Sequence, residues 1–172
     1  MKLRLTFVLL AVGIAGLRAA PVNAVCASVN GSAEFAAPGS GSFAPLHKGQ
    51  VLLIGSTVRT GDDGGAVLVT TPGSAIKIGS DSVLKINDLA FAKSGSAVTE
   101  RKARLELTSG AVSAMIDPST PKITDFQIQT PQGGASARGT FYAVAVYNGK
   151  TYVSVKEGHV GAGAAQNSKA GK

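Results

Sequence analysis

The stretch that decides the fold spans residues 126–160 and reads F-Q-I-Q-T-P-Q-G-G-A-S-A-R-G-T-F-Y-A-V-A-V-Y-N-G-K-T-Y-V-S-V-K-E-G-H-V. Its apolar residues come in short runs of period two, and turn residues separate the runs, as in successive β-strands. Asn148-Gly149 lies between two of these runs. This pair is the strongest short hairpin signal, because both central positions of a type I′ turn need a positive φ. The stretch therefore predicts three or four short strands joined by tight turns.

The chain from residue 25 onward shows the same pattern and has no convincing amphipathic helix. Its glycines, 22 in the whole chain, are expected to mark turns and bulges. Strands are expected at residues 25–35, 57–60, 66–70, 74–78, 82–86, 104–107, 111–116, 126–129, 135–138, 140–147 and 151–156, with a last one near Val160. Residues 90–102 are rich in Lys, Ser and Gly, which indicates an exposed loop or the tip of an extended hairpin. The predicted fold class is all-β, in a single domain.

Two regularities bear on the architecture. Short apolar strands at residues 67–69, 76–78 and 84–86 recur every eight or nine residues. Such strands stack as rungs of a twisted β-solenoid or pair as hairpins of a β-sandwich, and the sequence leaves both open. An apolar-x-x-Gly-x-Val pattern also occurs three times, around Gly49, Gly110 and Gly158. Because glycine adopts positive φ readily, each of these is expected to form a corner between strands.

The first 24 residues predict a signal peptide. Lys2 and Arg4 precede an uncharged apolar run at residues 5–17, and Val22-Asn23-Ala24 supplies the small residues of a cleavage site. The apolar run is shorter than the about 20 residues that a membrane-spanning helix needs. We expect residues 1–24 to be the signal peptide, residues 25–161 the domain, and residues 162–172 a disordered tail without large apolar side chains.

Charge and cysteine content narrow the functional classes. The formal net charge is +7, and the first 24 residues hold three cations and no acid, so the charge of the remainder is +4. Scattered charge of this size indicates solubility, and nucleic-acid binding is not expected. The single cysteine, Cys26, cannot form an intramolecular disulfide in an oxidising compartment.

No residue pattern predicts catalysis, a metal site or a cofactor. The two histidines, His47 and His159, are far apart in sequence, and neither belongs to a zinc-binding spacing. Asp62 and Asp63 are neighbours in a Gly-rich turn, whereas a hydrolase needs two carboxylates that face each other across a substrate. We therefore expect the protein not to be an enzyme.

Arg138-Gly139-Thr140 is the group that a plain series of strands does not require. In a functional interpretation, a rigid β framework presents the Arg138 guanidinium to a partner's carboxylate. In a structural interpretation, which we favour, Arg138 forms a buried or half-buried pair with an acidic residue such as Glu157, Glu34 or Glu106. Gly139 would then allow close backbone approach, and Thr140 would cap the turn.

The end of the chain resembles a known family. Residues 130–144 read T-P-Q-G-G-A-S-A-R-G-T-F-Y-A-V, and residues 153–160 read V-S-V-K-E-G-H-V. With the blocks at residues 46–63 and 105–112, they resemble the FecR domain of bacterial cell-envelope proteins. The resemblance implies a twisted, solenoid-like or sandwich-like all-β unit with R-G-T as a framework motif. It also implies export and interaction in place of catalysis.

The family's namesake is a membrane-spanning regulator that carries a signal from an outer-membrane iron transporter to a sigma factor. We expect no cytoplasmic region before the apolar segment, so iron-uptake signalling is not expected. The resemblance instead implies a stand-alone exported module, periplasmic or secreted, that binds a protein or an envelope polymer or acts as a scaffold. Its candidate binding residues are Arg138, Gly139, Thr140 and Glu157. The alternative is a membrane-anchored envelope signalling component that keeps the N-terminal apolar segment.

Overall fold

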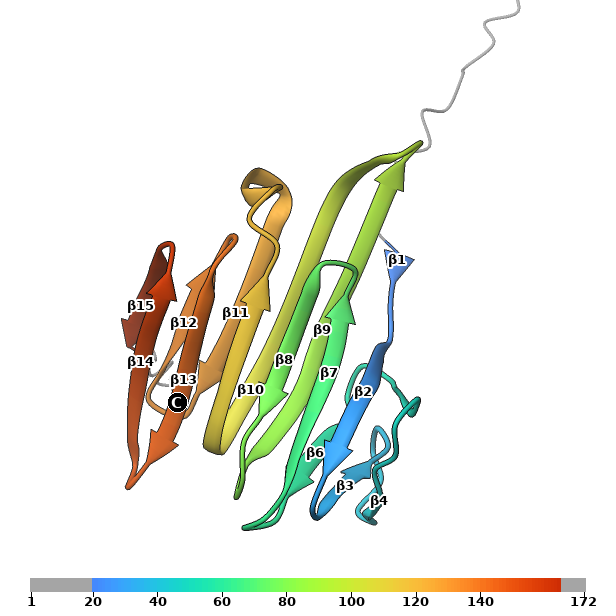
Figure 1. The fold of residues 1–172 in the computed structure, drawn as a ribbon, viewed down its shortest axis with the longest axis vertical. Helices are drawn as coiled ribbons and strands as arrows, with labels where there is room; N and C mark the ends of the chain where they lie inside the picture. Colours follow the sequence, from blue (N-terminus) through green and yellow to red (C-terminus); the bar gives the residue numbers. More distant parts are fainter. Residues whose placement is uncertain (1–19, 165–172) are drawn as a thin grey trace, which may run out of the picture.

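The computed structural model describes residues 20–164, which form one domain made almost wholly of β-strands (Figure 1). The strands are β1 Ala20–Pro21, β2 Ala24–Asn30, β3 Ala33–Ala36, β4 Ala44–Pro45, β5 Val51–Leu52, β6 Thr57–Thr60, β7 Gly65–Thr71, β8 Ser74–Ile78, β9 Val83–Ser94, β10 Ala97–Ile116, β11 Thr124–Thr130, β12 Gly133–Ala137, β13 Phe141–Tyr147, β14 Lys150–Glu157 and β15 Val160–Ala164. A short 3₁₀ turn, Pro121–Ile123, precedes β11. The prediction of a single all-β domain is confirmed.

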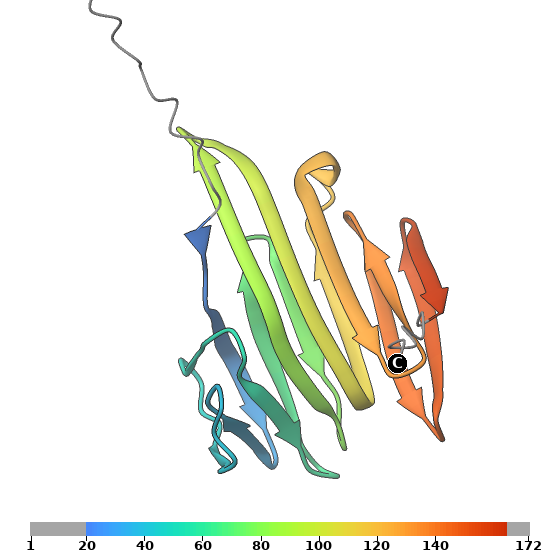
Figure 2. The same cartoon turned by 180° about the vertical axis from the view of Figure 1, so that it is seen from behind.

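Hydrogen bonds join the strands into one curled sheet whose two halves face each other (Figures 1 and 2). We call the halves layer A and layer B. Layer A contains β1, β3, β4, β6, β9, the first part of β10, β11, β12 and β15. Layer B contains β2, β5, β7, β8, the last part of β10, β13 and β14. The fold thus has the facing layers of a sandwich and a chain that winds between layers as in a solenoid.

Strand β10 belongs to both layers. Up to Ser109 it pairs with β9 in layer A, and from Gly110 onward it pairs with β8 and β13 in layer B. Residues 104–107 and 111–116, predicted as two strands, are therefore parts of one bent strand. Among the described strands, β10 and β11 form the one parallel pair, because the chain returns to layer A through the 3₁₀ turn before β11 begins.

The hydrophobic core lies between the two layers, as expected for a chain whose apolar residues alternate with polar ones. Both layers supply its largest side chains. The fully buried ones are Tyr142, Phe126, Leu52, Leu68, Ile76, Ile78, Leu84, Ile86, Leu89, Leu105, Leu107 and Ile128. Each buried aliphatic or Phe side chain contributes about 1.5–3 kcal/mol relative to an exposed one. This core needs no disulfide, and Cys26 is a buried free thiol within it.

Three glycines form the corners that the repeated sequence pattern predicts. Gly49, Gly110 and Gly158 have φ values of +85°, +81° and +88°. Gly49 lies between β4 of layer A and β5 of layer B, and Gly158 between β14 of layer B and β15 of layer A. Gly110 lies at the bend of β10. The prediction of strand corners is confirmed, and each of these corners carries the chain from one layer to the other.

The long hairpins also agree with the sequence. Asn148 and Gly149 have φ values of +48° and +67° between the paired residues Tyr147 and Lys150, so the predicted type I′ hairpin is confirmed. Residues 90–102 form the tip of the extended β9–β10 hairpin, one of the two predicted forms.

Two predicted boundaries are wrong. The expected strand at residues 25–35 is split into β2 and β3, because Gly31 has a φ of +60° and turns the chain. Residues 162–164, expected in a disordered tail, belong to β15, which pairs with β12. The rest of that tail, residues 165–172, and residues 1–19 of the predicted signal peptide lie outside the described residues. In the part that the structure covers, no helix has the length and apolarity to cross a membrane.

Candidate protein-interaction face

A continuous row of apolar side chains crosses the outer face of layer B. The pairing registers place Val51 opposite Val25, Val25 opposite Val69, and Val69 opposite Ala75. Ala75 is in turn opposite Met115, and Met115 opposite Phe141. Directly opposite residues of neighbouring strands point to the same face of a sheet. We call this set the apolar row; its members are Val51, Val25, Val69, Ala75, Met115 and Phe141.

Four members of the apolar row are open to solvent, and Ala75 and Phe141 are half-buried. Met115 is 62% exposed, and Val51, Val25 and Val69 are each at least 40% exposed. Their immediate neighbours along the strands, such as Leu68 and Ala114, face the core and are fully buried. Apolar side chains therefore lie on both faces of layer B. A contiguous exposed apolar surface of this kind is typical of a site that contacts another molecule.

The outer face of layer A is chemically different. Ion pairs connect its strands: Arg59 Nε lies 2.6 Å from Glu34 Oε2, Lys102 Nζ 2.5 Å from Asp88 Oδ2, and Arg104 Nη2 2.9 Å from Asp125 Oδ2. Asn87 also donates a hydrogen bond to Glu106 over 3.1 Å. These charges suit contact with water and leave layer B as the apolar side of the molecule.

A shallow hollow lies beside the apolar row on the outer face of layer B. Its floor consists of small residues of β10 and β13, including Ala111, Ser113, Ala143 and Ala145, and Tyr152 and Lys77 also line it. In the register, Tyr152 is opposite Ala145, and Tyr152 is 53% exposed. The hollow gives this face a recess next to its apolar side chains.

The structure corrects the favoured interpretation of Arg138. Arg138 lies at the bend between β12 and β13, and its side chain is exposed. Within residues 20–164 it forms no ion pair, and Glu157, its expected partner, is exposed and unpaired as well. The predicted buried or half-buried Arg138 pair is wrong, because the side chain lies on the exposed side of the chain, next to the buried Ala137. Glu34 pairs with Arg59 instead.

Gly139 and Thr140 hold this bend in place. Gly139 has a φ of +136°, and a Cβ there would lie 2.8 Å from the Pro118 Cα atom, so the predicted close backbone approach is confirmed. Thr140 is 5% exposed and donates a hydrogen bond from its hydroxyl to the carbonyl oxygen of His159 over 3.2 Å. These two residues connect the start of β13 to neighbouring loops.

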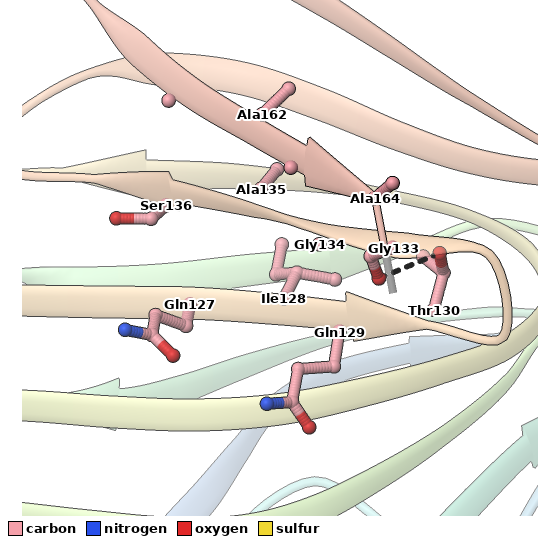
Figure 3. A pocket seen from close by; sticks show the side chains of 12 residues that line it. Gln127, Ile128, Gln129, Thr130, Gly133, Gly134, Ala135, Ser136, Ala162 and Ala164 are labelled. Atoms are coloured by element: carbon pink, nitrogen blue, oxygen red, sulfur yellow. Dashed lines mark hydrogen bonds between the residues drawn. The ribbon is translucent and has the colours of Figure 1, made fainter. Parts of the chain in front are cut away.

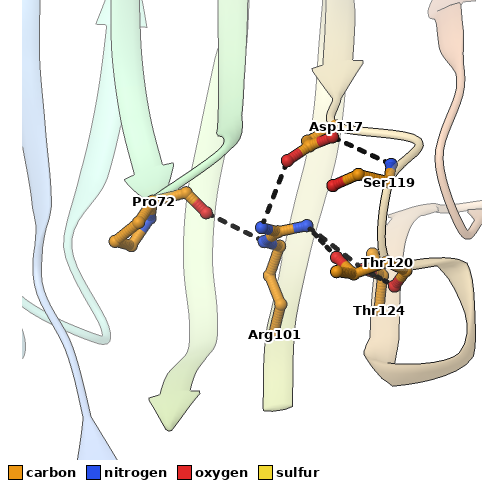
Figure 4. Close-up of polar contacts among 6 residues, drawn as sticks. All are labelled: Pro72, Arg101, Asp117, Ser119, Thr120 and Thr124. Carbon is orange, nitrogen blue, oxygen red and sulfur yellow. Dashed lines mark hydrogen bonds and ion pairs between the residues drawn. The ribbon is translucent and has the colours of Figure 1, made fainter. Parts of the chain in front are cut away.

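Among the described residues, the buried arginine is Arg101, which lies in the predicted hairpin tip (Figure 4). It is 4% exposed, and its Nε donates a hydrogen bond to the Pro72 carbonyl oxygen over 2.8 Å. Its Nη1 donates to Thr120 Oγ1 over 2.8 Å, and its Nη2 lies 3.7 Å from Asp117 Oδ2. One feature of the sequence indicates this burial. Side chains alternate between the two faces of a strand, so Arg101 points to the same side as the inward-facing Ala103, Leu105 and Leu107.

Groups with shifted pKa values do not assemble into a reactive site. Burial raises the pKa of the Cys26 thiol and of the Tyr142 phenol. Hydrogen bonds from the Ser119 backbone N–H and hydroxyl lower the pKa of Asp117, and the Arg101 charge acts in the same direction. Among the described residues, no three or more side chains of the types His, Cys, Asp and Glu gather as a metal site would require.

A second hollow lies over β11, β12 and β15 of layer A (Figure 3). Glycines at positions 134, 161 and 163 add no side chains to its lining, and Gln127, Gln129 and Ser136 border it. Gln127 is already engaged, since it donates a hydrogen bond to Asp125 and accepts one from Arg104. The lining contains no titratable side chain, so the hollow offers neither an acid nor a base.

Comparison with known proteins gives the family. The sequence profile of the FecR protein family matches residues 56–161, which is more than half of the chain. The chain belongs to the FecR protein family. The FecR match includes the bend at residues 138–140 and most of the apolar row, while Val25 and Val51 precede it.

Other comparisons add little to this FecR assignment. A crystal structure of a candidate anti-sigma factor from Parabacteroides distasonis is similar to this chain with a TM-score of 0.44 and 16% sequence identity. The similarity covers 62% of this chain and 46% of the other, so this FecR-family chain spans less than half the length of that protein. No curated protein matches the sequence.

Proposed function

We propose that this FecR-family protein is an exported, non-catalytic binding module of the bacterial cell envelope, periplasmic or secreted, and that the apolar row contacts a protein partner. The observation that carries the proposal is the register of Val51, Val25, Val69, Ala75, Met115 and Phe141 across six strands of layer B. Exposed apolar side chains stabilise a complex when a complementary protein surface excludes water from them.

The charges beside the row define the partner further. Lys77 lies on the same face, and Lys156 Nζ lies 5.2 Å from the centre of the Phe141 ring. A protein surface with apolar side chains and acidic residues at its rim complements this arrangement. An acidic envelope polymer would contact the lysines but would not cover the valines and the methionine, so it fits less of the face.

The test compares two substitutions in the same strand. Met115→Asp places a charge in the apolar row, and Thr108→Asp places one on an exposed position of the layer A part of β10. We expect a partner from envelope extract to be retained by the wild-type protein and by Thr108→Asp, and to be lost with Met115→Asp. Equal retention by both variants would contradict the proposed face, and capture of polysaccharide alone would contradict a protein partner.

A second candidate function is the anchored signalling component that keeps its N-terminal segment. Ala20 and Pro21 form β1 and pair with Phe91 and Ala90 of β9, and Ala24 is completely buried in the core. Cleavage after Ala24, the predicted site, would remove these contacts from the folded domain. The intact mass of the protein recovered from cells decides between the two: loss of residues 1–24 contradicts the anchored form.

A further inference from the structure

One end of the molecule leaves the edges of both layers uncovered. Within residues 20–164, β14 pairs only with β13, and β15 pairs only with β12. Figure 1 shows the two strands side by side at the same end of the sheet. A hollow opens between them, lined by Thr151 and Val153 of layer B and by Ala162 and Ala164 of layer A. Unpaired sheet edges are templates on which another strand can add.

The type I′ turn determines which backbone groups of β14 are free. In a hairpin with a two-residue loop, the residues next to the loop exchange hydrogen bonds, and every second pair after them does the same. Lys150, Tyr152 and Ser154 therefore bond to β13. The N–H and C=O groups of Thr151, Val153 and Val155 point away from β13, toward the open edge.

The same three residues turn their side chains to the interior. Val153 is opposite the buried Val144, and Val155 is opposite the buried Tyr142. Val155 is nevertheless 44% exposed, because no further strand covers this end of the core. An added strand would bury this apolar surface and bond to the free backbone groups at the same time.

The charged residues of β14 are two lysines and one acid, Glu157 at its last position, and the excess of lysines selects the chemistry of the added strand. Lys150 and Lys156 are exposed near the two ends of β14, about 20 Å apart at 3.3 Å per residue. Lys150 is opposite Tyr147 on the outer face, and Lys156 lies over the Phe141 ring. A second copy of the chain is disfavoured, since symmetric antiparallel pairing about Val153 would set Lys150 of one copy against Lys156 of the other.

We propose that the β14 edge binds an extended segment of a partner protein by strand addition. The segment has apolar side chains that point into the hollow between β14 and β15, and acidic side chains on its other face near Lys150 and Lys156. The edge meets the apolar row only where Lys156 lies over the Phe141 ring, and the proposal does not depend on the other members of the row.

The test uses fluorescent peptides of about ten residues in which apolar residues alternate with aspartate or threonine, and a matched set with lysine in place of aspartate. Binding to the full chain is measured by fluorescence anisotropy. Val153→Pro removes one outward N–H, a change that edge strands tolerate. Lys150→Glu combined with Lys156→Glu reverses the edge charge. Lys85→Glu combined with Lys93→Glu is the matched control on exposed lysines of β9.

We expect acidic peptides to bind, the edge reversal to weaken them roughly tenfold or more, and the β9 control to leave them unchanged. Val153→Pro should abolish binding; if that variant does not fold, slowed hydrogen exchange at Thr151 and Val155 with bound peptide replaces it. Met115→Asp should not affect the peptides, which separates this result from the test of the apolar row. The proposal is overturned if no acidic peptide binds, if the edge reversal has no effect, or if a β14-mediated dimer excludes the peptides.

Discussion

Arg101 of β10 donates a hydrogen bond from Nε to the carbonyl oxygen of Pro72, 2.8 Å away in the turn between β7 and β8. This bond connects the layer A half of the molecule to a turn of layer B. Because the guanidinium is 4% exposed, few water molecules can replace its partners when the side chain is removed.

Substitution of Arg101 should therefore be costly. Arg101→Met keeps much of the aliphatic volume but leaves the Pro72 carbonyl without its donor, and we expect the free energy of unfolding to fall by about 2–4 kcal/mol. Arg104→Met in the same strand is the control, because its ion pair with Asp125 is well exposed and should contribute less than about 1 kcal/mol. Urea denaturation measures both, and equal losses would contradict the importance of burial at Arg101.

Two substitutions in the bend at residues 138–140 should have very different effects on stability. Arg138→Ala should change the free energy of unfolding by less than about 0.5 kcal/mol, because the side chain is exposed and unpaired within the described residues. Gly139→Ala should lower it by about 2 kcal/mol or more, since alanine is strained at a φ of +136° and its Cβ would meet the Pro118 backbone. A strong loss of stability in Arg138→Ala would restore the framework role expected from the sequence.

Substitution of Gly110 and of Gly49 by alanine distinguishes the cost of backbone strain from the cost of a steric clash. Both have φ values near +80°, so alanine at either position costs about 1 kcal/mol of backbone strain. At Gly49 nothing lies within 4 Å of an added Cβ, whereas at Gly110 it would lie 2.2 Å from Ser82 Oγ and 2.7 Å from the Asp81 carbonyl oxygen. We expect Gly110→Ala to be at least about 2 kcal/mol more destabilising than Gly49→Ala. Similar melting temperatures for the two variants would show that the β10 bend relaxes easily.

The sequence predicts the local features of this fold well, because they depend on neighbouring residues. Period-two alternation, the Asn148-Gly149 turn and the corner glycines are all of this kind. The apolar row is different. Val25 and Val69 become neighbours only through the long-range pairing of β2 with β7, and no local pattern states that register. The apolar runs at residues 67–69 and 114–116 indicate only that apolar side chains lie on both faces of their strands, and so that some lie on an outer face.

The positions of Arg138 and Arg101 also depend on long-range contacts that the sequence does not state. Arg138 belongs to a conspicuous motif, and the sequence suggested a pair for it, but the direction of the chain at a bend depends on the whole sheet. Arg101 lies in a segment of low hydrophobicity and is nevertheless buried, because the β7–β8 turn and the loop around Thr120 close over it. The alternation of side chains along the strand could have indicated that Arg101 points inward. It could not have indicated that the turn and the loop would cover the side chain.

Tyr142 carries a buried hydroxyl without a hydrogen-bond partner among the described residues, although the residue is 1% exposed. An unpartnered polar group in a core is destabilising, because it has lost its hydrogen bonds to water. Tyr142→Phe removes the hydroxyl and keeps the ring, so we expect the free energy of unfolding at pH 7 to stay unchanged or to rise by about 1 kcal/mol. A clear loss of stability at pH 7 would mean that the hydroxyl is hydrogen-bonded in solution.

Alkaline pH should amplify this difference between wild type and Tyr142→Phe. Burial raises the pKa of Tyr142 above its usual value of 10.0, so above that pH the unfolded chain releases a proton that the folded chain retains. The folded state then binds more protons, and its stability falls as the pH rises, by up to about 1.4 kcal/mol per pH unit for one group. Tyr142→Phe lacks this loss, while Cys26, whose pKa burial also raises, contributes equally to both proteins. Urea denaturation at pH 7 and about pH 11 should therefore show a smaller decrease for Tyr142→Phe, and parallel decreases would contradict a buried, protonated phenol.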